Sequence, residues 1–435
     1  MRGALLLLAL IVLSAVIMLL SPGADASGAE SAVFALGFLL LASYIIGAYT
    51  LRLRMPMLTG YLLAGLFFGP FVFGALLPHC GVLSTRTLDR LGLIDSLALG
   101  LIAFTAGGEL RIAELKPRIA TIGRVSLAQL IVVFFGTSLL MFPLIGLLPF
   151  GGHLGWPAML SLALLLAVVC TANSPATTVA VINECRARGP MSTITLGVTV
   201  LKDVLVMVLF SVVLIAARLL TDQEGAADAR VGLLVFWEVL GSLGLGIVLG
   251  WLLSAYISRV KTGLPLLLLA LSFLSVELGR ELHLSGVLLN IAAGFYVMNY
   301  SKQGPRMIEA LERYSLPVFI IFFAVAGAKI DLPALKLMWP MALLLILARL
   351  VFTWLGTRLA LNRRERNKEY GPYLWLAFIS QAGVSLGIAS EIGRSLPELG
   401  SNLRTLIVAT IAINQVIGPI TFRYALVRAD EVDQS

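Results

Sequence analysis

The chain has 435 residues, of which 59% are hydrophobic and only 13% are charged, and its mean hydropathy is +0.96. A soluble globular protein is nearer half apolar and a quarter charged, so this composition excludes that class and indicates a polytopic membrane protein. The net charge of +8 is not gathered in a basic run on a water-soluble domain. Nucleic acid is therefore a poor candidate partner, and the charge is better explained by membrane topology.

A transmembrane helix needs about 20 mostly apolar residues, and fourteen apolar segments come near this length. The connections between them are short, and no soluble domain is left over. The sequence thus predicts an all-α polytopic membrane protein. The segments are residues 4–20, 31–50, 57–77, 91–108, 120–147, 155–181, 193–217, 231–256, 263–279, 284–300, 315–330, 337–360, 372–392 and 404–427.

The first segment has two interpretations. It carries one positive charge, an apolar core and then the small-x-small sequence "ADA" before Ser27, as a cleaved signal peptide does. The alternative is an extra membrane helix. We expect residues 1–26 to be one or the other, residues 31–427 to form the transmembrane domain with thirteen core helices, and residues 428–435 to form a short tail.

Lysine and arginine set the orientation, because cytoplasmic loops carry an excess of them. Twenty of these residues fall in one set of alternate loops and nine in the other. The richer set includes Arg363, Arg364 and Arg366 near the end of the chain. The alternation predicts a multi-pass protein of the cell (inner) membrane with a cytoplasmic C-terminus.

Three charged residues stand out well inside apolar segments: Lys202, Asp203 and Arg349. A charge inside the bilayer needs a partner or a water-filled cavity, so it indicates function by default. Asp203 is the carboxylate that lies well inside a span. Burial favours its protonated form and a nearby cation favours its ionised form, so one such group can bind a proton or a cation alternately. The alternative is a neutral or ion-paired packing residue.

The other two charges each have two kinds of candidate partner. Lys202 points about 100° away from Asp203 around a helix, so it faces a neighbouring helix or edges the same cavity, in a structural or a functional role. The guanidinium of Arg349 stays charged and needs an anion or backbone carbonyls. It is either a fixed counter-charge to Asp203 or a side chain that extends to the membrane surface, although its central position weakens the second reading.

Two segments are unusually polar. Residues 168–182 place Thr171, Asn173 and Ser174 next to Pro175, which removes a backbone donor and interrupts a helix. The oxygens and carbonyls exposed there could bind a cation. Residues 377–389 contain Ser380 and Gln381 among glycines. Broken helices near the bilayer midplane are typical of secondary transporters built from inverted repeats. Two matching three-helix units are predicted, at residues 120–217 and 337–427.

These features resemble the monovalent cation:proton antiporter superfamily, in its bacterial sodium/hydrogen exchanger branch. The resemblance extends from about Ala32 to Leu426. It rests on "RLRMPMLTGYLLAGLFFGP" (52–70), "LALGLIAFTAGGELRIAELK" (97–116), "LHLSGVLLNIAAGFYV" (282–297), "LPVFIIFFAVAGAKIDLPAL" (316–335) and "INQVIGPI" (413–420). Each motif is modest, and their order and spacing are the specific part.

The resemblance implies an unwound helix at "TANSPATT" and an essential aspartate at Asp203. The family often has Asp, Asn or Gln at the preceding position, where this chain has Lys202. The lack of a second acid there implies electroneutral exchange, and the lysine could also weaken transport. Arg349 matches a basic residue of the family. A homodimer with a moving core domain is implied, whereas no nucleotide-binding domain or cofactor is expected.

The leading hypothesis is an antiporter of Na⁺ or K⁺ against H⁺. An anion or organic-solute carrier remains open, because Lys202 and Arg349 together outweigh Asp203. So does a non-transporting membrane sensor in which Lys202 neutralises Asp203. An enzyme is not expected, since the segments show no nucleophile–base pair or metal-ligand set.

Overall fold

In the computed structural model, every regular element among the described residues is a helix. The described residues are 28–53, 55–76, 83–147, 154–221, 229–259, 264–302, 304–330, 332–381, 385, 388–389, 392 and 397–432. The long helices are α2 (Gly28–Arg52), α3 (Met57–Phe68), α5 (Thr85–Glu109), α7 (Ile119–Leu144), α8 (Trp156–Thr171), α9 (Pro175–Cys185), α10 (Pro190–Leu220), α11 (Ala229–Arg259), α12 (Leu264–Glu281), α13 (Gly286–Tyr300), α14 (Gly304–Ala328), α15 (Leu332–Ala360) and α18 (Pro397–Arg428). The short ones are α4 (Phe73–Leu76), α6 (Ile112–Leu115), α16 (Arg363–Arg366), η1 (Lys116–Arg118), η2 (Ile145–Leu147) and η3 (Leu374–Phe378).

Among these residues, eight stretches are long and apolar enough to cross a membrane, and two apolar helices are shorter. Helices suit the bilayer because they satisfy their own backbone hydrogen bonds. The prediction of an all-helical multi-span protein is confirmed. The predicted number of thirteen core helices and the inverted repeats stay predictions. Segment 4–20 and parts of segment 372–392 lie outside the described residues.

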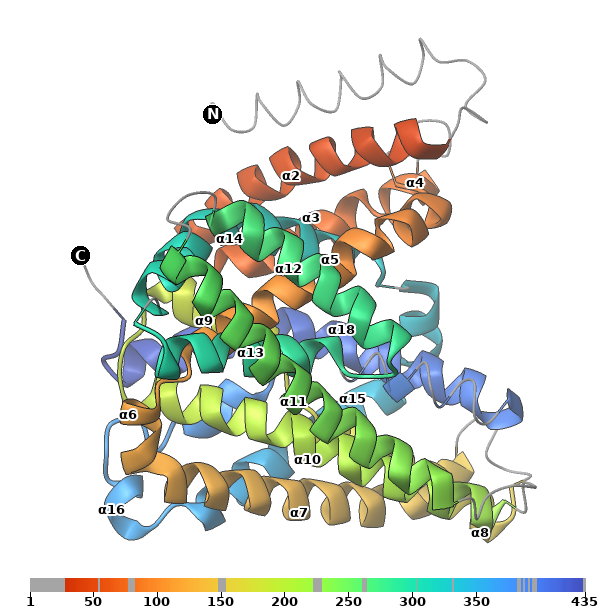
Figure 1. Ribbon diagram of the computed structural model, residues 1–435. Coiled ribbons are helices and arrows are strands. Elements are labelled where there is room, and N and C mark those ends of the chain that lie inside the picture. The colour runs from red at the N-terminus through yellow and green to blue at the C-terminus, as the bar shows by residue number, and fades with distance from the viewer. Residues whose placement is uncertain are drawn as a thin grey trace.

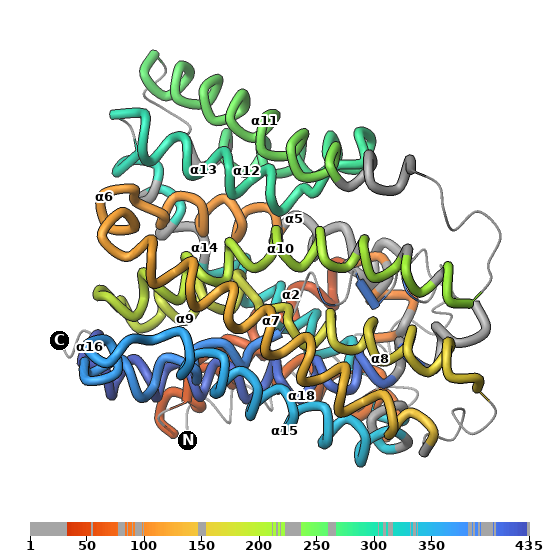
Figure 2. Tube along the Cα trace, turned by 90° about the horizontal axis from the view of Figure 1, so that it is seen from below, coloured from red at the N-terminus to blue at the C-terminus, as the bar shows by residue number. Residues whose placement is uncertain are grey.

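The helices pack in two groups, with α9 between them. One group contains α2, α3, α5, α11, α12, α13 and α14; the other contains α7, α8, α10, α15 and α18. Seen from below, α11 to α13 lie along one side of the molecule, and α15 and α18 lie along the opposite side (Figure 2). Helix α9 contacts α3 and α5 of the first group, and α10 and α18 of the second. Figure 1 shows the same arrangement from the side.

Glycine allows a very close contact in the first group, between α5 and α13. A Cβ atom on Gly107 would lie 2.0 Å from the carbonyl oxygen of Ile291, and one on Gly294 would lie 2.1 Å from that of Phe104. Both distances are far below van der Waals contact. The two backbones therefore touch directly, which is the usual way that helices gain packing energy in lipid.

Two carboxylates accept hydrogen bonds from the backbone N–H groups at the start of another helix. Glu184 of α9 accepts from the backbone nitrogens of Met57, at 2.7 Å, and Leu58, at 3.4 Å, at the start of α3. Glu431, after α18, accepts from the backbone nitrogens of Met191, at 2.5 Å, and Ser192, at 2.9 Å, at the start of α10. The first turn of a helix has unpaired N–H groups and a positive dipole end, so each contact stabilises the helix that it caps.

A third carboxylate, Glu365, joins α16 to α7. It is buried and accepts from the Thr121 hydroxyl, the Asn362 nitrogen and the Arg124 guanidinium, the last at 2.9 Å. Burial by itself raises the pKa of Glu365, but the hydrogen bonds from Thr121 and Asn362 and the charge of Arg124 outweigh it. The pKa is therefore held below its ordinary value.

We expect Glu365→Gln to destabilise the protein at neutral pH, because the charge-assisted hydrogen bonds of the carboxylate are lost. Arg124 is partly exposed to solvent, which limits the loss of stability to ~1–2 kcal/mol. The pKa of Glu365 is lower in the folded protein than in the unfolded chain. Its contribution to the free energy of unfolding is therefore complete at a pH above the pKa of the unfolded chain. It is lost as the pH falls through the folded value. Thermal unfolding of both proteins across an acid series checks this, and the difference should shrink in acid. The exposed neighbour Glu369→Gln should show no such difference.

Candidate functional site

The chain is interrupted between α8 and α9, where the sequence predicted a broken helix. Helix α8 ends at Thr171, and Ala172 has an extended backbone with φ −69° and ψ 145°. Pro175 starts α9, and a residue before proline avoids the helical conformation. Ser174 then caps α9, because its hydroxyl accepts from the Thr177 nitrogen at 3.2 Å. The interruption places residues 172–174 inside the protein, where their side chains are buried.

A second irregular stretch follows η3, at residues 379–381. Gln381 is fully buried and donates from Nε2 to the carbonyl oxygen of Val169, in the last turn of α8, at 2.7 Å. It accepts from Asn414 of α18 at 2.7 Å. A Cβ on Gly418 would lie 2.5 Å from the Cα of Ser380, so glycine is required where α18 crosses this stretch. The second stretch is therefore in direct contact with the last turn of α8, just before the first interruption.

Arg349 of α15 joins the two interruptions. Its exposed fraction is 1%. On the first stretch, Nε donates to the carbonyl oxygen of Cys170 at 2.9 Å and Nη2 to that of Ala172 at 3.0 Å. On the second, Nη1 donates to the oxygen of Ile379 at 2.5 Å and Nη2 to that of Phe378 at 2.9 Å. Carbonyls at a helix end carry partial negative charge, so this cation satisfies and neutralises both ends.

These contacts decide between the partners predicted for Arg349. The guanidinium is buried, so it does not extend to the membrane surface. Its four hydrogen bonds within the described residues end on backbone carbonyls rather than on Asp203. Five N–H donors in a planar fork suit two chain segments at once, which an ammonium could not match.

Lys202 of α10 is also buried, with an exposed fraction of 1%. Its Nζ donates to Oε1 of Gln129, on α7, at 2.9 Å and to Oδ1 of Asn173, in the first interruption, at 3.1 Å. Gln129 in turn donates to the hydroxyl of Thr357, on α15, at 2.8 Å. The lysine thus belongs to a polar network that connects α7, α10, α15 and the interruption.

Asp203 lies one residue further along α10. It has an exposed fraction of 5%, and its Oδ1 is buried without a hydrogen-bond partner. Most buried polar atoms have a partner, and a carboxylate oxygen without one is especially costly. This oxygen is therefore an unpaired acceptor in the interior of the protein.

The predicted site residues of the two interruptions lie near each other, but some of their side chains hydrogen-bond to the backbone of their own segment. Thr171 donates its hydroxyl to the Val168 carbonyl at 2.5 Å, and Ser174 caps α9. Asn173 already accepts from Lys202, while its Nδ2 has no partner. Ser380 lies at the second interruption, and its hydroxyl is buried and unpartnered.

Gln129 was not among the predicted site residues. It is the one amide side chain in a largely apolar segment, and that contrast is a signal that could have found it. Asn414, the partner of Gln381, sits in a similar position on α18. Both amides complete the hydrogen bonding of groups that the sequence did single out.

The sequence of this chain is similar to those of known membrane transporters. Residues 35–428 match the family described as "Sodium/hydrogen exchanger, transmembrane". The Na⁺/H⁺-K⁺ antiporter GerN of Bacillus cereus is 24% identical over 413 residues, which cover 92% of this chain and 97% of that protein. The iron transporter MagA of Paramagnetospirillum magneticum is 24% identical over 391 residues, or 87% and 82% of the two chains.

Among solved structures, the sodium proton antiporter MjNhaP1 of Methanocaldococcus jannaschii at pH 8 has the same fold. It superposes with a TM-score of 0.63 over 93% of this chain and 96% of that one, at 18% sequence identity. The family match, the membrane-spanning helices and this shared fold agree with one another. The protein therefore belongs to the transmembrane sodium/hydrogen exchanger family.

Proposed function

We propose that the protein exchanges a monovalent cation, Na⁺ or K⁺, for protons across the membrane, and that Asp203 is the shared binding site. The observation that carries this is the buried, unpartnered Oδ1 of Asp203 on the helix beside the two interruptions. A cation would hold this carboxylate ionised, and a proton would neutralise it once the cation leaves. One carboxylate that holds either a cation or a proton gives electroneutral exchange.

Oxygens for a dehydrated cation are at hand in the interrupted stretches. The hydroxyls of Thr171, Ser174 and Ser380 retain acceptor capacity, because a hydroxyl can donate one hydrogen bond and still accept. Na⁺ and K⁺ are hard cations that bind such neutral oxygens together with a carboxylate. The unpartnered oxygens of Ser380 and Asn414 add two further acceptors at the second interruption, which supports the proposal.

We propose that Lys202 competes with the transported cation. Its ammonium is held by Gln129 and Asn173, so it occupies an amide oxygen that a cation could otherwise use. It also adds a positive charge next to Asp203 along the chain. Both effects weaken cation binding without removing the carboxylate, so Lys202 modulates affinity and Arg349 supports the backbone.

The direct test is proton flux in proteoliposomes loaded with an internal pH dye. Pulses of Na⁺, K⁺ or Li⁺ should each be compared with choline, and a pulse of Fe²⁺ covers the activity named for MagA. We expect a pulse of Na⁺ or K⁺ to change the internal pH of the vesicles. An ionophore that collapses the membrane potential should leave this change unaltered, because electroneutral exchange moves no net charge. Flux driven by an anion gradient alone would favour a carrier of anions.

We expect Lys202→Gln to raise the apparent affinity for the cation severalfold, because the competing ammonium is gone and a neutral amide takes its place. The measurement is the cation concentration at half-maximal flux. Lys336→Gln removes an exposed lysine from α15 and should leave it unchanged. Flux in Lys202→Gln together with none in the wild type would instead make the native protein a silenced, non-transporting member of the family.

Further features are proposed on the family relationship and on charge distribution. We propose a homodimer in the cell (inner) membrane with its C-terminus in the cytoplasm. The three-helix units 120–217 and 337–427 would be related as inverted repeats. Each unit contains one interruption, and Arg349 of the second unit holds the carbonyls of both.

A further inference from the structure

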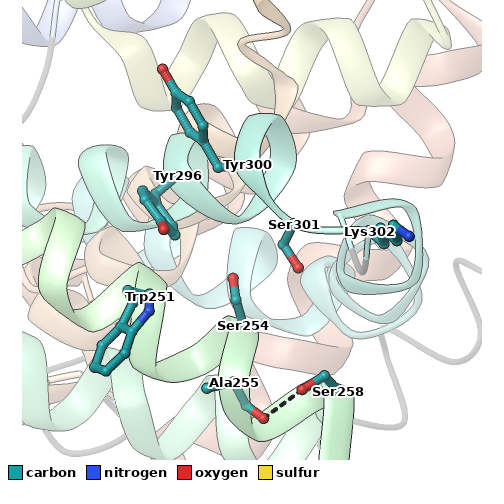
Figure 3. A pocket seen from close by; sticks show the side chains of 8 residues that line it. All are labelled: Trp251, Ser254, Ala255, Ser258, Tyr296, Tyr300, Ser301 and Lys302. Carbon is teal, nitrogen blue, oxygen red and sulfur yellow. Dashed lines mark hydrogen bonds between the residues drawn. The ribbon is translucent and has the colours of Figure 1, made fainter.

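A cavity of about 410 Å³ lies between the ends of α11 and α13, on residues that take no part in the Asp203 site. Helix α11 lines it with Trp251, Ser254, Ala255 and Ser258, and α13 and the residues after it contribute Tyr296, Tyr300, Ser301 and Lys302. Figure 3 shows the Ser254 and Ser301 hydroxyls on facing elements, with Trp251 and Tyr296 on the other side of Ser254 from Lys302; the Lys302 side chain starts beside Ser301, and its ammonium points away from Ser254. The cavity thus combines aromatic walls with hydroxyls and a cation.

The polar atoms of this cavity favour an anionic guest. The hydroxyl oxygen of Ser254 is buried and has no hydrogen-bond partner, although it can donate. Lys302 is exposed, and Arg259 in the last turn of α11 adds a second exposed cation nearby in the sequence. None of the eight residues that line the cavity carries a carboxylate. Cation and hydroxyl together are the donors that bind phosphate oxygens.

An exposed apolar track runs from the cavity along α11. Leu240, Val248 and Leu252 are each 49% exposed, and Trp251 is 56% exposed. Gly244 lies on the same face, four residues from Leu240 and from Val248, and a Cβ there would have no atom within 4 Å. Residues spaced by four share one face of a helix, so the track leads from the cavity toward the middle of the membrane.

We propose that this cavity binds the headgroup of one anionic phospholipid. The phosphate accepts from the Lys302 ammonium and the Ser254 hydroxyl, and an acyl chain lies along the α11 track over Gly244. Aromatic side chains next to a lysine at the end of an apolar helix are typical of the membrane–water boundary, which is the depth of a headgroup. Basic pockets between transmembrane helices are suited to such lipids.

Native mass spectrometry of the full-length protein tests this with added phosphatidylglycerol or phosphatidylcholine of the same acyl chains. The wild type should retain one phosphatidylglycerol in preference to phosphatidylcholine. Lys302→Gln should reduce that preference about fivefold, since one cation near the membrane surface contributes about that factor. Ser254→Ala should reduce it as well. Lys336→Gln, an exposed lysine of α15, should keep the wild-type preference.

A second variant tests the acyl track separately from the headgroup. A Cβ on Gly244 would meet no atom within 4 Å, so Gly244→Leu should fold normally and still displace the lipid chain. Glycerol phosphate at the same concentration should not displace the lipid, because it lacks the chain. Equal retention of the two lipids, or equal preferences in Lys302→Gln and Lys336→Gln, would overturn the proposal. The proposal would also be overturned if Lys302→Gln or Gly244→Leu changed the ratio of dimer to monomer but not the retention of lipid. The face would then be a contact between two copies of the chain.

Discussion

Asp203→Asn is expected to abolish cation-driven proton flux while leaving the protein folded. Asparagine has nearly the same shape, and Oδ1 of Asp203 has no hydrogen-bond partner to lose. The amide cannot take up or release a proton, and it lacks the negative charge that attracts a cation. Flux in proteoliposomes should therefore fall to that of empty vesicles for every cation tested. Thermal unfolding in detergent should remain close to that of the wild type.

Glu277→Gln is the matched control for this experiment. It removes an exposed carboxylate from α12, in the other group of helices. Its flux should equal that of the wild type. Residual flux in Asp203→Asn with the wild-type cation dependence would assign the site to another group, and loss of flux in both variants would point to a general effect of charge on the vesicles.

Arg349→Met should cause the largest loss of stability in this chain. The guanidinium satisfies four carbonyls from two interrupted segments, all of them buried. Methionine keeps much of the length but none of the donors, so those oxygens lose their partners in a dry interior. A buried acceptor left without a hydrogen-bond partner costs ~1–3 kcal/mol, so the loss of these four hydrogen bonds should cost several kcal/mol. The check is thermal unfolding in detergent, together with the yield of monodisperse protein.

Two companion variants separate charge from geometry at this position. Arg349→Lys keeps the charge but offers one ammonium, which cannot reach both segments, so stability should recover only in part. Arg358→Ala removes an exposed arginine from the same helix, where it lies over the Trp354 ring, and should cost ~1 kcal/mol or less. Equal stability of Arg349→Met and the wild type would show that the carbonyls have other partners.

Much of the architecture could be predicted from local properties of the sequence. Apolar segments of about 20 residues identify membrane helices because the bilayer leaves few alternatives to a helix. The break after Thr171 follows from Pro175 and its capping residue Ser174, which act within a few residues of each other. Asp203 and Arg349 stand out because a charge in an apolar segment is rare.

The pairing of the site residues was decided by tertiary structure. Arg349 and Cys170 are 179 residues apart, and Lys202 and Gln129 are 73 apart. A guanidinium in an apolar helix needs acceptors, but carboxylates and carbonyls satisfy it equally well until packing brings one of them within 3 Å. The sequence therefore determined that this protein crosses a membrane and which charges it places there. Helix packing decided that Arg349 holds backbone carbonyls, that Lys202 is held by two amides, and that an oxygen of Asp203 is left free.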